Sequence, residues 1–133
     1  ATLTEGSLLF IDLDGFKQIN DHYGHDAGDY VLQETARRLQ LDLTHDDLAA
    51  RLGGDEFIVF LARSRAETIM YAENVLLRLN DPFFFDATAM QVTPSIGIAR
   101  YPDDGRTTSL LLIRADEAMY TVKQEEKNAY RFK

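Results

Sequence analysis

The stretch at residues 48–61, LAARLGGDEFIVFL, decides the fold because two apolar runs flank a pair of glycines. Both runs have the composition of strands, and Gly53-Gly54 is the kind of two-residue turn that requires positive φ and closes a hairpin. The stretch therefore predicts two antiparallel strands, Leu48–Leu52 and Phe57–Leu61, joined by a tight turn.

Outside this hairpin, short apolar runs alternate with segments of helical spacing. The runs predict strands at 7–12, 83–85, 90–99 and 129–132, and the helical spacing predicts helices at 27–39, 64–79 and 109–126. Asp26 is the expected N-cap of the first helix. Ser64 and Glu67 form a capping-box pattern before the second helix, which residues 80–82 (NDP) end. Because Pro94 lacks an N–H, its strand is expected at a sheet edge or with a bulge.

Composition limits the kind of protein this is. A chain of 133 residues with 45% hydrophobic and 27% charged residues is expected to form one globular domain. A net charge of -8 argues against binding nucleic acid, which requires a basic face. Cysteine is absent, no apolar stretch approaches the roughly 18 residues of a membrane span, and the N-terminus lacks a signal pattern. We expect a cytoplasmic domain without membrane contact, although its parent protein could be attached through another domain.

Two pairs of acidic residues mark a candidate site. Asp12 and Asp14 end the first predicted strand, and Asp55 and Glu56 follow the glycine turn, so strand pairing could bring the two pairs together. Clustered carboxylates raise one another's pKa unless cations lie between them, and oxygen ligands of this kind select Mg²⁺ or Mn²⁺. The pattern suggests a two-metal site for phosphoryl or nucleotidyl transfer. Taken singly, each acid is better explained as a solvated residue at a strand end or turn.

Four motifs in sequence order resemble the GGDEF domain family of diguanylate cyclases. Residues 51–57 (RLGGDEF) contain the family signature, and residues 12–29 (DLDGFKQINDHYGHDAGD) are similar to its other long motif. Residues 95–99 (SIGIA) and 115–120 (ADEAMY) follow, with Lys123 and Lys127 after them. One short motif is weak support, but four in order span nearly the whole chain.

The resemblance implies a fold and an activity. The fold is α+β: a central, mostly antiparallel sheet of about five strands with surrounding helices and a βαββαβ core, similar to nucleotidyl cyclases and polymerase palms. The activity is the condensation of two GTP molecules into cyclic di-GMP with release of pyrophosphate, a bacterial second-messenger reaction. It implies a homodimer and Mg²⁺ or Mn²⁺, two ions per active site. Residues 1–133 would form a single GGDEF domain that lacks the family's usual N-terminal D-x-L-T-G-L-x-N-R-like motif and first helix.

The resemblance also assigns roles to individual residues. Asp55 and Glu56 would be catalytic, with Asp55 accepting the proton. Asp12, the Leu13 carbonyl, Asp55 and Glu56 would hold the metal ions. Substrate-binding positions would be Asn20, His25 and Asp29 for guanine and the neighbouring loop, and Phe16, Lys17, Gly53, Gly54, Lys123 and Lys127 around the phosphates and the turn. A spacing of four places both lysines of the last pair on one helix face.

Plainer explanations exist for several of these residues. Asp29 is also explained as an acid at a helix start, and His25 as an ordinary loop histidine. Lys123 and Lys127 are explained about as well by a solvated charged face. The family's product-inhibition pattern requires arginine where this chain has Thr44, so we expect no such site.

A regulatory module is the main alternative to an enzyme. Several stretches, including residues 101–105 (YPDDG) and 128–132 (NAYRF), resemble GGDEF domains that precede an EAL phosphodiesterase domain, where the GGDEF half often only senses GTP. Glu126 replaces the usual glycine near the triphosphate, and its charge would repel that anion. The intact Asp55 and Glu56 favour the enzyme. The parent protein is expected to carry sensory domains, an EAL domain, or both.

Overall fold

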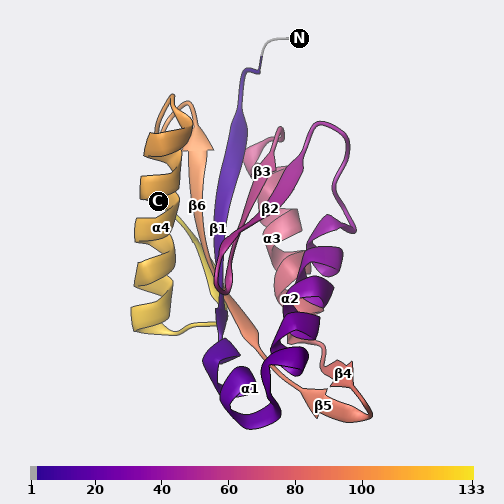
Figure 1. Ribbon diagram of the computed structural model, residues 1–133. Helices are drawn as coiled ribbons and strands as arrows, with labels where there is room; N and C mark the ends of the chain where they lie inside the picture. The colour runs from indigo at the N-terminus through magenta and orange to yellow at the C-terminus, as the bar shows by residue number, and fades with distance from the viewer. Residues whose placement is uncertain (1–2) are drawn as a thin grey trace.

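The computed structural model describes residues 3–133, and a central five-stranded sheet organises them (Figure 1). The elements in chain order are β1 Gly6–Asp14, α1 Phe16–Tyr23, α2 His25–Gln40, β2 Leu48–Gly53, β3 Glu56–Leu61, α3 Arg65–Asn80, β4 Phe83–Phe85, β5 Thr88–Met90, β6 Thr93–Tyr101, α4 Thr108–Glu125 and β7 Ala129–Phe132. The strand order is β2-β3-β1-β6-β7, with a separate β4-β5 hairpin. Only β6 and β7 pair in parallel, so the predicted mostly antiparallel α+β sheet is confirmed.

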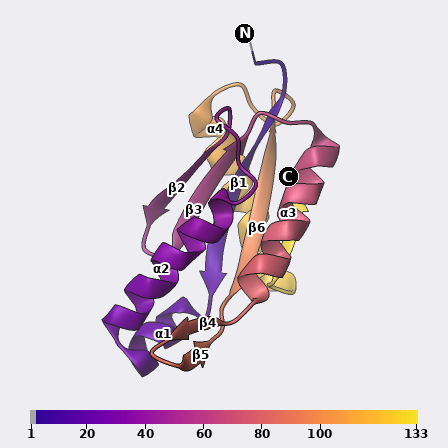
Figure 2. The same ribbon diagram turned by 90° about the vertical axis from the view of Figure 1, so that its right-hand side faces the viewer.

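Helices cover both faces of this sheet. α4 lies along one face and α2 and α3 lie along the other, as Figure 2 shows from the side of α2 and α3. Side chains of β1 alternate between the two sides, because successive residues of a strand point to opposite faces. Leu9, Ile11 and Leu13 belong to the core under α2 and α3, whereas Leu8 and Phe10 pack against α4. The same alternation places Asp12 and Asp14 on the α4 face.

The strand β6 approaches α4 unusually closely. A methyl group added at Gly97 would lie 2.0 Å from the Ala115 carbonyl oxygen and 2.2 Å from the Met119 nitrogen. Glycine is therefore required at this crossing, since any side chain would separate the helix from the sheet. The close contact sets the distance between α4 and the sheet. It thereby also determines where side chains near the end of α4 lie relative to the neighbouring strand β1.

Local signals explain most element boundaries. Ser64 and Glu67 form the predicted capping box at the start of α3, which ends at Asn80 as expected. The N-cap of α2 is Gly24, and the predicted cap Asp26 instead lies in the first turn, so that prediction is wrong. Gly24 has a φ of 95°, a conformation that glycine adopts without a steric penalty and that lets α1 and α2 follow one another directly.

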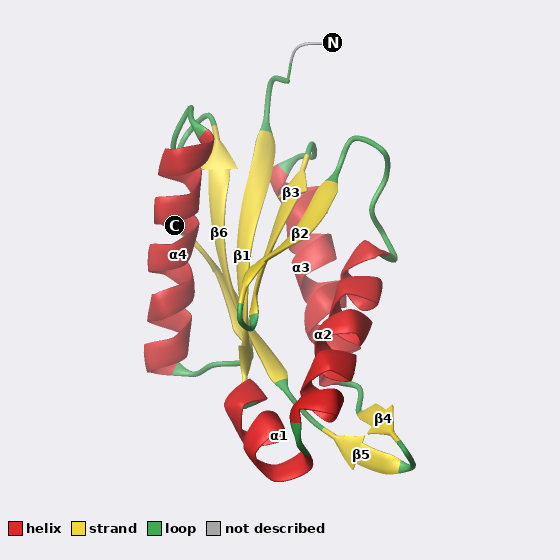
Figure 3. Cartoon of the chain, in the orientation of Figure 1, coloured by secondary structure: helices red, strands yellow, loops and turns green. Residues whose placement is uncertain are grey.

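Two further expectations are corrected (Figure 3). The helix α1 was not expected, because its eight residues bury only Phe16 and Ile19. The strand predicted at 90–99 is divided between β5 and β6, and β6 lies inside the sheet without a bulge against β1. Pro94 is tolerated there because neither neighbouring strand needs an N–H from it. Its partner Leu13 directs the Leu13 N–H away from β6 toward β3, and β7 pairs with β6 only from Ser95 onward. No helix within residues 3–133 is both long and apolar enough to cross a membrane.

Candidate active site

The end of β1 and the turn between β2 and β3 form the candidate site. Asp12 is paired with Glu56 of β3 on one side and with Ser95 of β6 on the other. The Leu13 N–H donates to the Asp55 carbonyl oxygen at 3.2 Å, so β1 is bonded directly to the turn. In an antiparallel pair the N–H and C=O of one residue face the same neighbour, so the Leu13 carbonyl also faces this turn. The predicted meeting of the acidic pairs is confirmed for Asp12 with Asp55 and Glu56. It is not found for Asp14, which lies beyond the β1–β3 pairing and contacts β6 and Lys123 instead.

The turn itself differs slightly from the prediction. Gly53 ends β2, the register shifts between Arg51 and Gly53, and Gly54 and Asp55 make the turn. Gly54 has a φ of 49°, which favours glycine, and the Arg51 Nε donates to its carbonyl oxygen at 2.9 Å. The signature thus has a structural reason: arginine and glycine fix the turn that presents Asp55 next to β1.

A lysine from α4 faces both acids of β1. The Lys123 Nζ lies 3.2 Å from Asp12 Oδ2 and 3.5 Å from Asp14 Oδ1. Partial burial acts to lower the pKa of Lys123, but the two carboxylates outweigh this effect and raise it. Lys123 is therefore a fixed cation at the end of β1.

The acids of the site repel one another. Burial, followed by the charge of Asp55, raises the pKa of Asp12 to about 6 in spite of Lys123. Burial also raises the pKa of Glu56, assisted by the charges of Asp55 and Asp116. A single lysine thus leaves the negative charge of the cluster incompletely balanced.

The donors of this cluster fit a divalent cation that arrives with phosphates. The Asp12 Oδ1 is buried and has no hydrogen-bond partner among the described residues, so one carboxylate lone pair faces no donor. Within residues 3–133, no three His, Cys, Asp or Glu side chains are arranged to hold a metal ion by themselves. Mg²⁺ commonly binds through one or two carboxylates and completes its shell with water and substrate phosphates, so the residues fit that mode of binding.

The predicted guanine-binding residues lie where α1 meets α2. Asn20 is on α1, and its Oδ1 occupies the space beside Gly28, where an added methyl group would come within 1.8 Å. His25 begins α2 and Asp29 lies one turn further along, both exposed to solvent. Asp29 is therefore beyond the first turn of the helix, which weakens its explanation as a helix-start acid. The three residues gather on adjoining helices, but their binding role stays a prediction.

Comparison with known proteins decides the family. The family model described as diguanylate cyclase, GGDEF domain, matches residues 2–129. The chain belongs to the GGDEF domain family. It is 44% identical over 127 residues to the bifunctional diguanylate cyclase/cyclic di-GMP phosphodiesterase MucR of Pseudomonas aeruginosa, covering 95% of this chain and 18% of MucR. It is 43% identical over 128 residues to the diguanylate cyclase TpbB of the same species, covering 94% of this chain and 29% of TpbB.

A solved structure supports the same conclusion. The crystal structure of the TpbB GGDEF domain from Pseudomonas aeruginosa superimposes with a TM-score of 0.92 at 42% identity, covering 96% of this chain and 81% of that chain. The present chain spans less than a third of the length of MucR and of TpbB. The expected GGDEF family and fold are therefore confirmed.

At the end of α4 in this GGDEF domain, one predicted placement is wrong. α4 ends at Glu125, and Lys127 lies beyond it with a φ of 54°, so Lys123 and Lys127 do not share a helix face. The Lys127 N–H donates to the Val122 carbonyl oxygen at 2.8 Å, which closes the helix and turns the chain toward β7. Phe16 and Lys17 open α1 directly after Gly15, whose φ is 85°. Their N–H groups belong to the first turn of α1, where N–H groups have no acceptor within the helix.

The sequence pattern places Asp14 at the site as a member of an acidic pair, but it gives no role to Thr93 or Ser95. Asp14 is nearly enclosed, and Thr93 and Ser95 of β6 donate to its carboxylate at 2.9 Å. These partners lie about 80 positions away along the chain, so only the pairing of β1 with β6 brings them together. The SIGIA motif begins with Ser95, which was the available signal.

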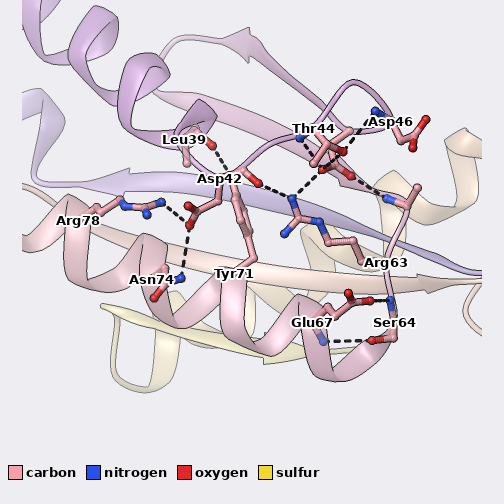
Figure 4. Close-up of polar contacts among 12 residues, drawn as sticks. Leu39, Asp42, Thr44, Asp46, Arg63, Ser64, Glu67, Tyr71, Asn74 and Arg78 are labelled. Carbon is pink, nitrogen blue, oxygen red and sulfur yellow. Dashed lines mark hydrogen bonds and ion pairs between the residues drawn. The ribbon is translucent and has the colours of Figure 1, made fainter.

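The segment in which the family's product-inhibition pattern would lie is occupied by a polar network (Figure 4). Asp47 accepts hydrogen bonds from the Thr44 N–H at 3.0 Å and from the Ala62 N–H at 3.0 Å, and its side chain is almost fully buried. Arg63 bonds both Asp47, at 2.7 Å, and the Asp42 carbonyl oxygen. Asp47 is thus committed to contacts within the domain, and the expected absence of an inhibitory site stays a prediction.

Proposed function

We propose that this GGDEF domain condenses two molecules of GTP into cyclic di-GMP and pyrophosphate as the catalytic part of a larger protein. The observation that carries the proposal is the meeting of Asp12 with Asp55 and Glu56. Within residues 3–133 the buried Asp12 Oδ1 has no hydrogen-bond partner, and burial, followed by the charge of Asp55, raises the pKa of Asp12 and of Glu56. Such a cluster is unfavourable unless cations and substrate complete it. Its assembly from the family signature supports an enzyme rather than a binding module.

The residues of the chain divide the chemistry between them. The 3′-hydroxyl oxygen of one GTP forms a bond to the α-phosphorus of the other, the bond from that phosphorus to the pyrophosphate oxygen breaks, and Asp55 accepts the hydroxyl proton. The same exchange is then repeated to close the ring. Asp12, the Leu13 carbonyl, Asp55 and Glu56 would hold two Mg²⁺ or Mn²⁺ ions, which would stabilise charge developing on the phosphate oxygens.

Phosphate and base would be held by separate elements. The free N–H groups of Phe16 and Lys17 at the start of α1 suit anionic oxygens, and Lys123 supplies a fixed positive charge. The exposed Lys127 would add a second cation from the turn after α4. Asn20 and Asp29, with His25 beside them, would pair with guanine, and a site built to pair with that base rejects adenine because its polar groups would stay unpaired.

Partners follow from the stoichiometry of the reaction. Each domain would bind one GTP, so two domains must face one another, and a homodimer is required at least transiently. The relatives are much longer than this chain, so we infer sensory or EAL domains in the same protein. We also propose the cytoplasmic location that the sequence leads us to expect for this domain.

A GTP-binding regulatory domain is the second candidate. MucR is a bifunctional diguanylate cyclase/cyclic di-GMP phosphodiesterase, and another similar chain of known structure is an EAL/GGDEF domain protein from M. capsulatus. Glu126 is exposed directly next to Lys127, where its charge would oppose phosphate binding. In this role the domain would bind GTP, release no product and control an adjacent phosphodiesterase.

One experiment separates the two candidates. The full-length protein, its Asp55→Ala variant and the control variant Asp46→Ala are incubated with GTP and Mg²⁺, and the products are resolved by chromatography. Asp46 is a suitable control because it is an exposed acid outside the candidate site, and within residues 3–133 its carboxylate pairs only with the neighbouring His45. Cyclic di-GMP from the wild type and Asp46→Ala, but not from Asp55→Ala, supports the cyclase. If the wild-type protein binds GTP but none of the three proteins forms cyclic di-GMP, the result contradicts the cyclase and favours the regulatory domain.

A further inference from the structure

Asp14 is the acid of the site that the proposed reaction does not use. Its side chain is only 7% exposed, although it lies two residues from Asp12 on the same face of β1. Two hydroxyls of β6 fix its orientation: Thr93 Oγ1 donates to Oδ2 at 2.9 Å, and Ser95 Oγ lies 2.9 Å from both carboxylate oxygens. A buried charge held in this way carries a high desolvation cost, so its opposite side needs a compensating partner.

The partners on that opposite side are cationic or electropositive. Lys123 Nζ lies 3.5 Å from Asp14 Oδ1, and the Asn128 N–H donates to Oδ2 at 3.4 Å. Asp14 therefore contacts both the end of α4 and the turn that connects α4 to β7. Lys127 is the residue of this turn immediately before Asn128, and both have positive φ, at 54° and 48°.

A second contact holds the same turn from the side of α3. The side-chain amides of Asn128 and Asn80 exchange hydrogen bonds of 2.8 and 3.1 Å. Asn80 is in turn fixed to its own helix by a bond of 2.6 Å to the Leu76 carbonyl oxygen. The turn that carries Lys127 is thus bound to β1 through Asp14 and to α3 through Asn80, and a residue in a left-handed conformation persists only when its surroundings hold it there.

We propose that Asp14 is a positioning residue, which orients Lys123 and the α4-β7 turn so that Lys123 and Lys127 face the phosphates of GTP. The inference rests on the proposed function, since it assigns Asp14 to the binding of that substrate. Asp14 would touch neither the metal ions nor the nucleotide and would act through the two lysines.

Charge alone predicts the opposite effect of removing Asp14. A carboxylate near a triphosphate repels it, so Asp14→Asn would tighten GTP binding if repulsion were the only contribution. If Asp14 orders the lysines, the same variant weakens binding, because the lysines lose their defined geometry. The sign of the change distinguishes the two explanations. Asp116→Asn is the matched control, since this exposed acid of α4 influences Glu56 by charge but forms no ion pair with either lysine within residues 3–133.

The test measures nucleotide binding by calorimetry in the full-length protein with Mg²⁺, using GTP and guanosine. We expect Asp14→Asn to weaken GTP binding roughly tenfold, the scale of a hydrogen bond to a charged group, and to leave guanosine binding unchanged. Ser95→Ala, which keeps the charge but frees the carboxylate, should weaken GTP binding in the same direction by a smaller factor. The effects of Asp14→Asn and Lys123→Ala should be strongly non-additive in the double variant.

The possible results separate this inference from the function on which it rests. GTP binding by Asp14→Asn that equals or exceeds the wild type overturns the inference and leaves the function standing. Equal losses for GTP and guanosine, or additive effects of the two variants, also overturn it, because they indicate a general structural role. A wild-type protein that binds no GTP refutes the proposed function and the inference together.

Discussion

Replacing Gly97 by alanine should displace α4, the helix that carries Lys123. The added methyl carbon would lie 2.0 Å from the Ala115 carbonyl oxygen and 2.2 Å from the Met119 nitrogen, whereas an ordinary contact begins near 3.4 Å. Both opposing atoms belong to the helix backbone, so no side-chain rotation can relieve the overlap. The helix and the sheet must therefore separate by more than 1 Å at this crossing.

The cost of this separation has two sources. Overpacking of a well-packed interior typically costs about 1–3 kcal/mol. A radial gap of up to about 1 Å also removes a quarter to a half of the dispersion energy of the contacts that it opens, here those of Leu111 and Met119 against Leu8 and Phe10. We therefore expect Gly97→Ala to lower the free energy of unfolding by about 3–4 kcal/mol, a fall in Tm of roughly 10–15 °C for a domain of this size.

Urea unfolding followed by circular dichroism measures this effect. Gly53→Ala is the matched control, because Gly53 lacks positive φ and an added methyl group there meets no atom within 4 Å. The control should change the free energy of unfolding by less than about 0.5 kcal/mol. A Gly97→Ala variant as stable as the control would refute the argument that this close crossing fixes α4.

Three further changes test other parts of the structure by the same unfolding assay. Arg37 and Arg38 hold the pKa of Glu34 at about 2, so Glu34→Gln should lower the free energy of unfolding by about 1 kcal/mol at pH 7. The difference between variant and wild type should shrink as the pH falls from 4.5 toward 2, because wild-type Glu34 then also becomes neutral. Arg38→Ala should cost about 2 kcal/mol, because Arg38 bonds three main-chain carbonyls at and after the end of α3 and lies over the Phe83 ring at 3.9 Å. Gly54→Ala should cost about 1 kcal/mol, since its φ of 49° is unfavourable for a residue with a side chain.

Each of these expectations has a clear contrary result. A pH-independent cost of Glu34→Gln would show that packing, not charge, accounts for the contribution of Glu34. An Arg38→Ala variant within about 0.5 kcal/mol of the wild type would mean that water satisfies the three carbonyls equally well. Equal stability of Gly54→Ala and the wild type would show that the signature turn relaxes into another geometry.

Signals confined to neighbouring residues made the fold largely predictable. The paired apolar runs around Gly53-Gly54 indicated the β2-β3 hairpin, and the Ser64–Glu67 capping box located the start of α3. Both are local, because a turn or a cap depends on residues only a few positions apart. α1 was missed since its eight residues bury too few side chains to produce a helical pattern.

The candidate site was predictable only where strand pairing could be anticipated. Asp12 and Glu56 lie opposite one another because β1 pairs antiparallel with β3, in the register that buries the apolar side chains of both strands. The contacts of Asp14 could not be predicted, since Thr93, Ser95 and Lys123 reach it from distant parts of the chain. The position of Lys127 depends on a left-handed backbone conformation that residue spacing does not reveal.

The most direct measurement compares GTP binding with and without Mg²⁺ in the wild-type protein and in Asp12→Asn. If the acid cluster at the end of β1 binds a cation together with substrate phosphates, Mg²⁺ will strengthen GTP binding by the wild type more than about tenfold. The effect of Mg²⁺ will be far smaller in Asp12→Asn. This variant lacks the carboxylate whose buried oxygen has no other partner among the described residues. Equal affinity for GTP with and without Mg²⁺ in the wild type would contradict the account of this site.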